Sequence, residues 1–193
     1  MPLPLPRRLR LVGGLALTCG AAMLAPAAAQ PLAGERQITL HQRDGGAVAL
    51  GSVTFTPTPD GRSRFVLALR PEAFKDFFLS MKEFKCVESP VEIFCHVPYP
   101  YPQPATVGSA DFAWLEHSLL FMFKLPAEFG ARLWNGVYFQ LRRTERGLEG
   151  KPQAVDLNRI SAPPDAPGVP PYRSALRDDI APGARFFDRL TIE

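Results

Sequence analysis

The chain has 193 residues, of which 46% are hydrophobic and 21% charged, with a mean hydropathy of −0.04. This length is typical of one domain with a sizeable core. A membrane-embedded bundle is excluded, because only one apolar run, at the N-terminus, approaches the length of a spanning helix. Proline and glycine, with 21 and 15 residues, are enriched but stay below the range of disordered chains.

Residues 1–29 have the pattern of a secretory signal peptide. Three arginines near the start are followed by an apolar stretch and then by the small residues Ala27-Ala28-Ala29. We expect cleavage after Ala29. The mature chain, residues 30–193, would then be a single periplasmic or extracellular domain without a transmembrane anchor.

The N-terminal segment also allows other readings. Arg7-Arg8 could begin a twin-arginine signal, although Arg10 stands where that motif has an apolar residue. Cys19 could be a lipid-attachment cysteine, although the residues before it fit that pattern poorly. An uncleaved anchor is a further alternative, which the short and glycine-rich apolar run disfavours.

Removal of this segment changes the charge of the chain. The full sequence has a net charge of +3, and the three arginines of the segment account for all of it. A neutral mature domain has no electrostatic reason to bind nucleic acid. We therefore expect a protein, a glycan or other envelope component, or a small apolar molecule as its partner.

Cysteine usage agrees with export. If Cys19 leaves with the signal, Cys86 and Cys95 remain, and an even pair in an oxidising compartment predicts a disulfide. In a hairpin over 84–97 with its turn at 89–92, Cys86 lies opposite Cys95, so the bond joins the two strands. Disulfide-bonded cysteines are neither nucleophiles nor metal ligands.

The mature chain is predicted to be β-rich. The clearest hairpin pairs 47–57 with 62–69 and places Val53 opposite Leu67, so that apolar side chains share one face. A three-residue loop then ends at Gly61, which takes the left-handed conformation that such loops need.

Short helices are expected at three places. The first begins at Pro71, which suits the first helical position, and the residues after it have the spacing of one helical face. These apolar residues are Phe74, Phe77, Phe78 and Met81. The second helix is expected at 111–117 and the third from Pro126 to about residue 135.

The remaining segments complete an antiparallel fold. Further strands are expected at 38–41, 119–125, 137–144, 154–160 and 186–192, with a proline-rich connector at 163–171 before the last strand. The predicted class is a β-rich α+β domain, an antiparallel sheet, sandwich or partly open barrel built from hairpins, with two or three short helices.

Alternating prolines at 98–104 exclude a helix and a central strand. Tyr99 and Tyr101 lie two residues apart and would point to the same side of an extended chain. Held by prolines, they could anchor a protein or glycan at low entropic cost. The alternative is that both rings pack back on the sheet. Trp114 and Trp134 are expected in the core.

The sequence has no common hydrolase or nucleotide-binding signature, and His41, His96 and His117 lack the close spacing of a metal pair. Glu116, His117 and Ser118 are adjacent, whereas members of a catalytic triad converge from separate segments. We predict a non-enzymatic binding or assembly module without metal or cofactor. The alternative is a small exported hydrolase with His96 or His117 as base and a carboxylate partner, Glu116 being one candidate.

Overall fold

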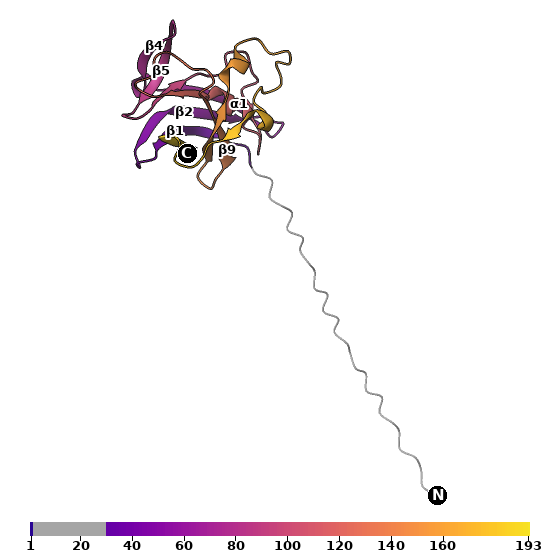
Figure 1. The fold of residues 1–193 in the computed structure, drawn as a ribbon. Helices are drawn as coiled ribbons and strands as arrows, with labels where there is room; N and C mark the ends of the chain where they lie inside the picture. The colour runs from indigo at the N-terminus through magenta and orange to yellow at the C-terminus, as the bar shows by residue number, and fades with distance from the viewer. Residues whose placement is uncertain (2–29) are drawn as a thin grey trace.

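The structure is a computed structural model that describes Met1 and residues 30–193 (Figure 1). The expectations about the signal segment and Cys19 fall on residues outside this part. The predicted cleavage after Ala29 lies at its boundary.

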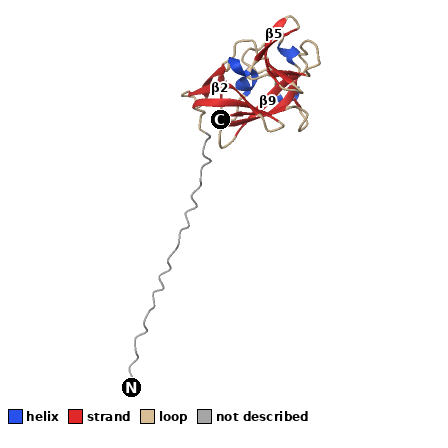
Figure 2. Ribbon diagram, turned by 90° about the vertical axis from the view of Figure 1, so that its left-hand side faces the viewer, coloured by secondary structure: helices blue, strands red, loops and turns tan. Residues whose placement is uncertain are grey.

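One antiparallel sheet organises residues 30–193. Its twelve strands are β1 (Gly34–Gln42), β2 (Ala47–Pro57), β3 (Ser63–Leu69), β4 (Lys75–Leu79), β5 (Lys82–Glu88), β6 (Ile93–His96), β7 (Thr106–Val107), β8 (Phe121–Lys124), β9 (Gly136–Arg143), β10 (Leu148–Val155), β11 (Asp178–Asp179) and β12 (Phe187–Ile192). The spatial order is β4-β5-β6-β8-β9-β10-β12-β1-β2-β3-β7, and β11 pairs with β10 at the side. The sheet curls but stays open, since its end strands do not pair with each other (Figures 1 and 2).

Buried side chains lie on both faces of β6, β8 and β9, because consecutive residues of each strand are buried and point to opposite sides of the sheet. One of these faces holds an aromatic cluster in which Phe94 of β6 stacks on Phe121 of β8 with a centroid distance of 4.6 Å. Phe139 of β9 and Phe187 of β12 approach the same ring at 6.0 and 5.3 Å. All four side chains are fully buried, so the core joins strands from distant parts of the chain.

The β2–β3 hairpin has the predicted register. Val53 lies opposite Leu67, and the N–H of Thr58 donates to the carbonyl of Arg62 at 2.9 Å. Three residues therefore form the loop. Gly61 ends it with a φ of 78°, the left-handed conformation expected from the sequence.

The helix predicted after Pro71 is wrong. Only a 3₁₀ turn, η1 (Pro71–Ala73), forms before the chain enters β4, which pairs with β5. Ser80 and Met81 make the turn between these strands with φ values of 48° and 70°, as a two-residue type I′ turn requires. Phe78 points outward and is 74% exposed. The apolar spacing fitted a helix, but pairing with β5 satisfies the backbone as a strand.

The predicted disulfide hairpin is present as β5 and β6. Cys86 lies opposite Cys95 and the two are disulfide-bonded. The turn is closed by the N–H of Ser89, which donates to the carbonyl of Glu92 at 2.9 Å. The bond joins neighbouring strands in the part of the sheet that carries β4 at its edge.

In the second half of the chain, some predicted helices and strands are confirmed and others are wrong. The expected helix at 111–117 is α1 (Ala113–Ser118), the only α-helix among the described residues, and β8 matches the expected buried strand. The helix expected from Pro126 to about residue 135 does not form. Phe129 there is 99% exposed and Trp134 is 62% exposed, so Trp134 does not belong to the core.

The strand expected at 154–160 has different bounds in the structure. β10 begins at Leu148 and pairs along all of β9, while residues expected to end this strand form the 3₁₀ helix η2 (Leu157–Ile160). Asp156 caps this helix by accepting a hydrogen bond from the N–H of Asn158 at 3.0 Å. Such an Asp cap competes with strand geometry and turns the chain.

The proline-rich connector at 163–171 leads through η3 (Ser174–Leu176) and β11 to β12. β12 is a strand, as predicted, and lies between β10 and β1. Leu190 lies opposite Leu40, so the last strand joins the first within the sheet. Within the described residues, no helix is long and apolar enough to cross a membrane.

Candidate functional site

His117 is a buried structural residue of α1. Its Nε2 accepts a hydrogen bond from the backbone N–H of Tyr172 at 3.1 Å, and its Nδ1 therefore carries the proton that it donates to the carbonyl of Ala113 at 2.6 Å. Burial lowers the pKa of His117 to about 4, so the ring is neutral at pH 7. Both nitrogens thus hold backbone groups, and the ring stacks on Tyr172.

Glu116 joins α1 to β9. Because β8 pairs with β9 only at Gly136 and Val137, the N–H of Leu141 has no strand partner on that side, and Glu116 Oε1 accepts it at 2.6 Å. Glu116 Oε2 accepts a hydrogen bond from the hydroxyl of Tyr138. Burial raises the pKa of the carboxyl, and the hydrogen bond from Tyr138 opposes this. Both oxygens are engaged in holding the fold.

His96 is half-buried and its Nε2 lies 2.9 Å from the carbonyl oxygen of Ser118. Burial lowers the pKa of His96. Ser118, in turn, donates its hydroxyl to the carbonyl of Trp114 at 2.9 Å. The residues of the hydrolase alternative therefore lie near α1, but each is hydrogen-bonded to the backbone.

Tyr99 and Tyr101 do not form an exposed pair. Tyr99 is only 7% exposed and lies edge-on to His117 and Tyr101, with centroid distances of 6.0 and 5.5 Å. The N–H of Tyr99 donates to the carbonyl of His117 at 2.9 Å, which turns this ring inward. Tyr101 is half-buried and lines a surface cavity.

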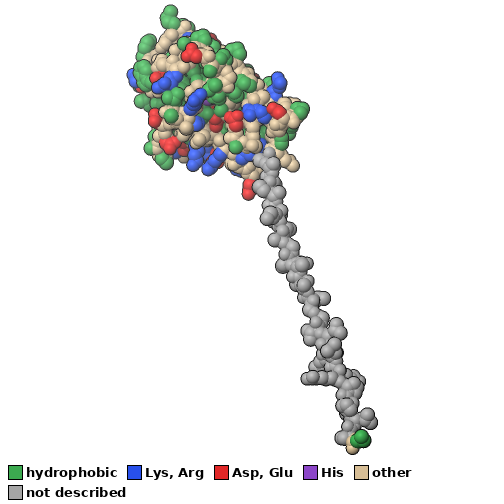
Figure 3. Space-filling model, turned by 90° about the vertical axis from the view of Figure 1, so that its right-hand side faces the viewer, with side chains coloured by type: hydrophobic (Ala, Val, Ile, Leu, Met, Phe, Trp, Pro, Cys, Tyr) green, Lys and Arg blue, Asp and Glu red, His purple; other side chains and the backbone are tan. Residues whose placement is uncertain are grey.

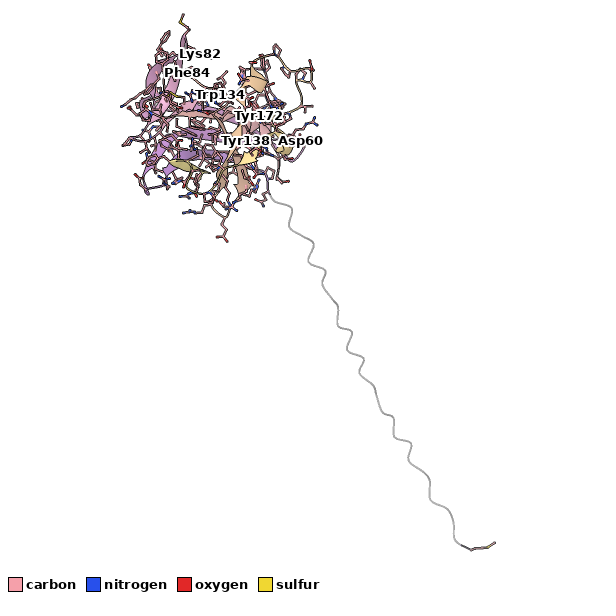
Figure 4. The ribbon with its side chains drawn as sticks, viewed as in Figure 1. Asp60, Lys82, Phe84, Trp134, Tyr138 and Tyr172 are labelled. Atoms are coloured by element: carbon pink, nitrogen blue, oxygen red, sulfur yellow. A yellow bond between two sulfur atoms is a disulfide. The ribbon has the colours of Figure 1, made fainter. Side chains whose placement is uncertain are left out.

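This cavity, which we call the apolar groove, has a volume of about 420 Å³. Four segments form it: the β4–β5 hairpin, the start of the proline–tyrosine segment, the loop before β9, and η2. Its lining residues are Leu79, Ser80, Lys82, Phe84, Val97, Pro98, Pro100, Tyr101, Ala131, Leu133, Leu157, Ile160 and Ser161. Figure 4 places Lys82 and Phe84 on the β4–β5 hairpin, apart from Tyr138 and Tyr172.

Hydrogen bonds join three of the four walls of the apolar groove. The hydroxyl oxygen of Ser80, in the β4–β5 turn, accepts a hydrogen bond from the N–H of Ala131 at 2.9 Å. The N–H of Leu157 donates to the carbonyl of Leu133 at 2.8 Å. The hairpin, the loop and η2 are thus tied together without a ligand, as in a pre-formed binding pocket.

Lys82 is the charged residue of the groove lining. Its Nζ lies 5.7 Å from the ring centroid of Phe84, which belongs to the same face of β5. No carboxylate among residues 30–193 is ion-paired with it, whereas Lys85 on the other face of β5 pairs with Asp76 and Glu83.

The other large cavity differs in character. It has a volume of about 540 Å³ and lies between β10, β12 and the segment before β12. Charged residues of both signs line it, among them Glu149 and Arg189, which approach each other to 4.0 Å. On the face of the molecule in Figure 3, basic and acidic side chains are likewise intermixed. This second cavity has three acidic and three basic side chains in its lining, whereas the apolar groove has only Lys82, so the second cavity suits an apolar ligand less well.

No family model, curated protein or solved structure matches this chain. In the described part of the chain, no three His, Cys, Asp or Glu side chains gather as a metal site would require. Sequence reasoning missed the groove, because its walls come from four separate segments. It had singled out only Tyr101 among the residues that line it.

Proposed function

We propose that this chain is an exported, non-enzymatic binding module that holds a small apolar ligand in the apolar groove. The proposal rests on the groove itself, an apolar cavity of about 420 Å³ in which hydrogen bonds join three of the four wall segments. Small-molecule sites are typically pre-formed, mostly apolar cavities of about 300–1,000 Å³.

The side chains near α1 favour binding over hydrolysis. A general base needs a nitrogen or oxygen that can take a proton from substrate or water. His117 uses both ring nitrogens on backbone groups, and Glu116 uses both carboxylate oxygens. His96 is directed at the carbonyl of Ser118. His117 and Glu116 therefore have every polar side-chain atom engaged in the fold, whereas His96 keeps an Nδ1 that is free of hydrogen bonds to residues 30–193. Binding is the first proposal, and a hydrolase with His96 as base is the second.

Export is part of the proposal. It rests on the order of basic, apolar and small residues in 1–29 and is supported independently by the disulfide, since such bonds persist in oxidising compartments. Mass spectrometry of protein from its native host should find an N-terminus at or near Gln30. An intact Met1 or a lipid on Cys19 would contradict it.

Displacement of a neutral fluorescent probe, N-phenyl-1-naphthylamine, tests binding in the groove. Octanol, decanol and dodecanol are the competitors. A buried methylene contributes about 0.8 kcal/mol, so affinity should rise about fourfold per carbon until the groove is filled. No displacement, or no dependence on chain length, would overturn the proposal.

A filled groove should lose this binding. Ala131→Trp places an indole against the groove lining, while Ala127→Trp, on the exposed part of the same loop, is the matched control. Ser161→Trp fills the groove from an exposed position and replaces the first variant if that one does not fold. Unchanged alcohol binding in a folded Ala131 or Ser161 variant would place the ligand elsewhere and refute the proposal.

A further inference from the structure

We propose that the ligand of the apolar groove is an amphiphile with one apolar chain and an anionic head group, and that Lys82 binds the head group. This inference rests on the proposed binding function and adds the charge of the ligand. It rests on the position of the Lys82 ammonium, which has no ion pair in the described part of the chain and lies beside the buried apolar floor of the groove.

The groove has a polarity gradient that matches such a molecule. Phe84, Leu157 and Ile160 are buried, with 7%, 2% and 6% exposure, and form the floor. Lys82 is exposed and stands at the rim, with its Nζ 5.7 Å from the ring centroid of Phe84. A chain lying on the floor would therefore place its head group beside the ammonium while both remain in water.

The charges of the β4–β5 hairpin single out Lys82. Lys75 pairs with Glu88 across the hairpin, and Lys85 pairs with Asp76 and Glu83. Within residues 30–193, Lys82 has no such partner. The three lysines and three carboxylates of 75–88 sum to zero charge, but Lys82 is the one lysine of the hairpin without an ion pair to the described residues, and it lies at the groove.

A second polar group at the groove also suits an anion. The hydroxyl oxygen of Ser80 accepts the N–H of Ala131, so its own proton remains available for a hydrogen-bond acceptor. Ser80 lies two residues before Lys82 and lines the same cavity. An anionic head group can accept from both, whereas a cationic head group would meet a like charge.

The test compares decanoate with decylammonium, which share a tail and differ in the sign of the head group. Both compete with N-phenyl-1-naphthylamine at neutral pH, below their micelle concentrations. An exposed ion pair gains at most a few-fold in affinity and a like-charge contact loses a similar factor. We therefore expect decanoate to bind about tenfold more tightly, with a ratio that falls as salt is added.

Two variants locate the charge. Lys82→Met should bring the ratio close to one while retaining the tail's affinity. Lys85→Met removes the same charge from the other face of the same strand and should leave the ratio unchanged. Equal binding of both amphiphiles to the unmodified protein, or a preference that survives Lys82→Met, would overturn the inference and leave the proposed function intact. Failure of both amphiphiles and of decanol to bind would overturn the proposed function itself.

Discussion

His117 should make the stability of this fold depend on pH. In the folded protein the pKa of its ring is lowered from 6.5 to about 4, first because the ring is fully buried. In the unfolded chain the ring has its ordinary pKa. Below about pH 6.5 the unfolded chain therefore binds a proton that the folded protein does not, and the unfolded state gains stability.

The size of the effect follows from the difference between the two pKa values. The contribution of His117 is constant above pH 7 and is lost as the pH falls through 6.5 toward 4. Each pKa unit corresponds to about 1.4 kcal/mol. At pH 4 the loss should reach about 3 kcal/mol, a large part of the typical stability of a small domain.

Denaturant unfolding of the unmodified protein and of His117→Gln, at several pH values, isolates this effect. Gln keeps an acceptor near the position of Nε2 but does not titrate. The difference in unfolding free energy between the two proteins should shrink by about 3 kcal/mol between pH 7 and pH 4. Subtraction removes the opposing contributions of Glu116 and Glu92, whose pKa values are raised by burial. A pH-independent difference would refute the reasoning.

A direct measurement covers the case in which His117→Gln does not fold. The ring resonances of His117, followed by NMR in the unmodified protein, should not titrate between pH 8 and about pH 5.5, because the folded pKa is about 4. A midpoint near the ordinary value of 6.5 would show that the ring is accessible and charged in the folded state.

Three further substitutions test the fold. Replacing Cys86 and Cys95 together by Ala should lower the unfolding free energy by about 2–3 kcal/mol, the loop-closure entropy of so short a loop. A double variant that does not fold would show that the bond is required for folding and would contradict this prediction. Gly61→Ala should lower the unfolding free energy by about 1 kcal/mol through its φ of 78° alone, because no atom lies within 4 Å of an added Cβ. The control Gly168→Ala, with equally open space and no positive φ, should be neutral. Glu116→Leu should cost about 2–4 kcal/mol in chemical denaturation, because it leaves two buried donors without an acceptor, and a neutral result would argue against that network.

Local sequence patterns correctly predicted the hairpins in which a single strand register fits the loop conformation and also places the apolar side chains on one face. The β2–β3 hairpin is such a case, because the pairing of Val53 with Leu67 and the left-handed Gly61 require each other. The Cys86–Cys95 pair fixed the next hairpin in the same way. Here sequence reasoning and structure agree.

The segment after Pro71 shows where local patterns fail. Phe74, Phe77, Phe78 and Met81 fit a helical face, but the chain forms a strand with Phe78 and Met81 exposed. Whether this segment becomes a helix or a strand depends on its pairing with β5, and the spacing of its apolar residues gives no information about that pairing. The assignment of Trp134 to the core failed for a related reason, since the helix expected around it does not form.

The candidate site required the tertiary structure. Glu116 was recognised as an acid beside a histidine, but its role follows from Leu141, whose N–H lacks a strand partner where β8 ends. The sequence predicts Tyr101 as an anchor for a protein or glycan, and the structure places this residue in the wall of the apolar groove. The sequence did not indicate Lys82 as a binding residue, because its lack of an ion pair within residues 30–193 becomes visible only when the ion pairs of Lys75 and Lys85 are known.

The most direct test of the central claim is to locate a bound ligand by NMR. With decanol added to protein carrying labelled methyl groups, the methyls of Leu79, Leu133, Leu157 and Ile160 should shift in a saturable manner and show contacts to the alkyl chain. The methyls of Leu190, buried in the core of the sheet, should not change. Saturable shifts at the groove with a silent core would support the binding function. An absence of shifts, or shifts confined to another part of the surface, would contradict it.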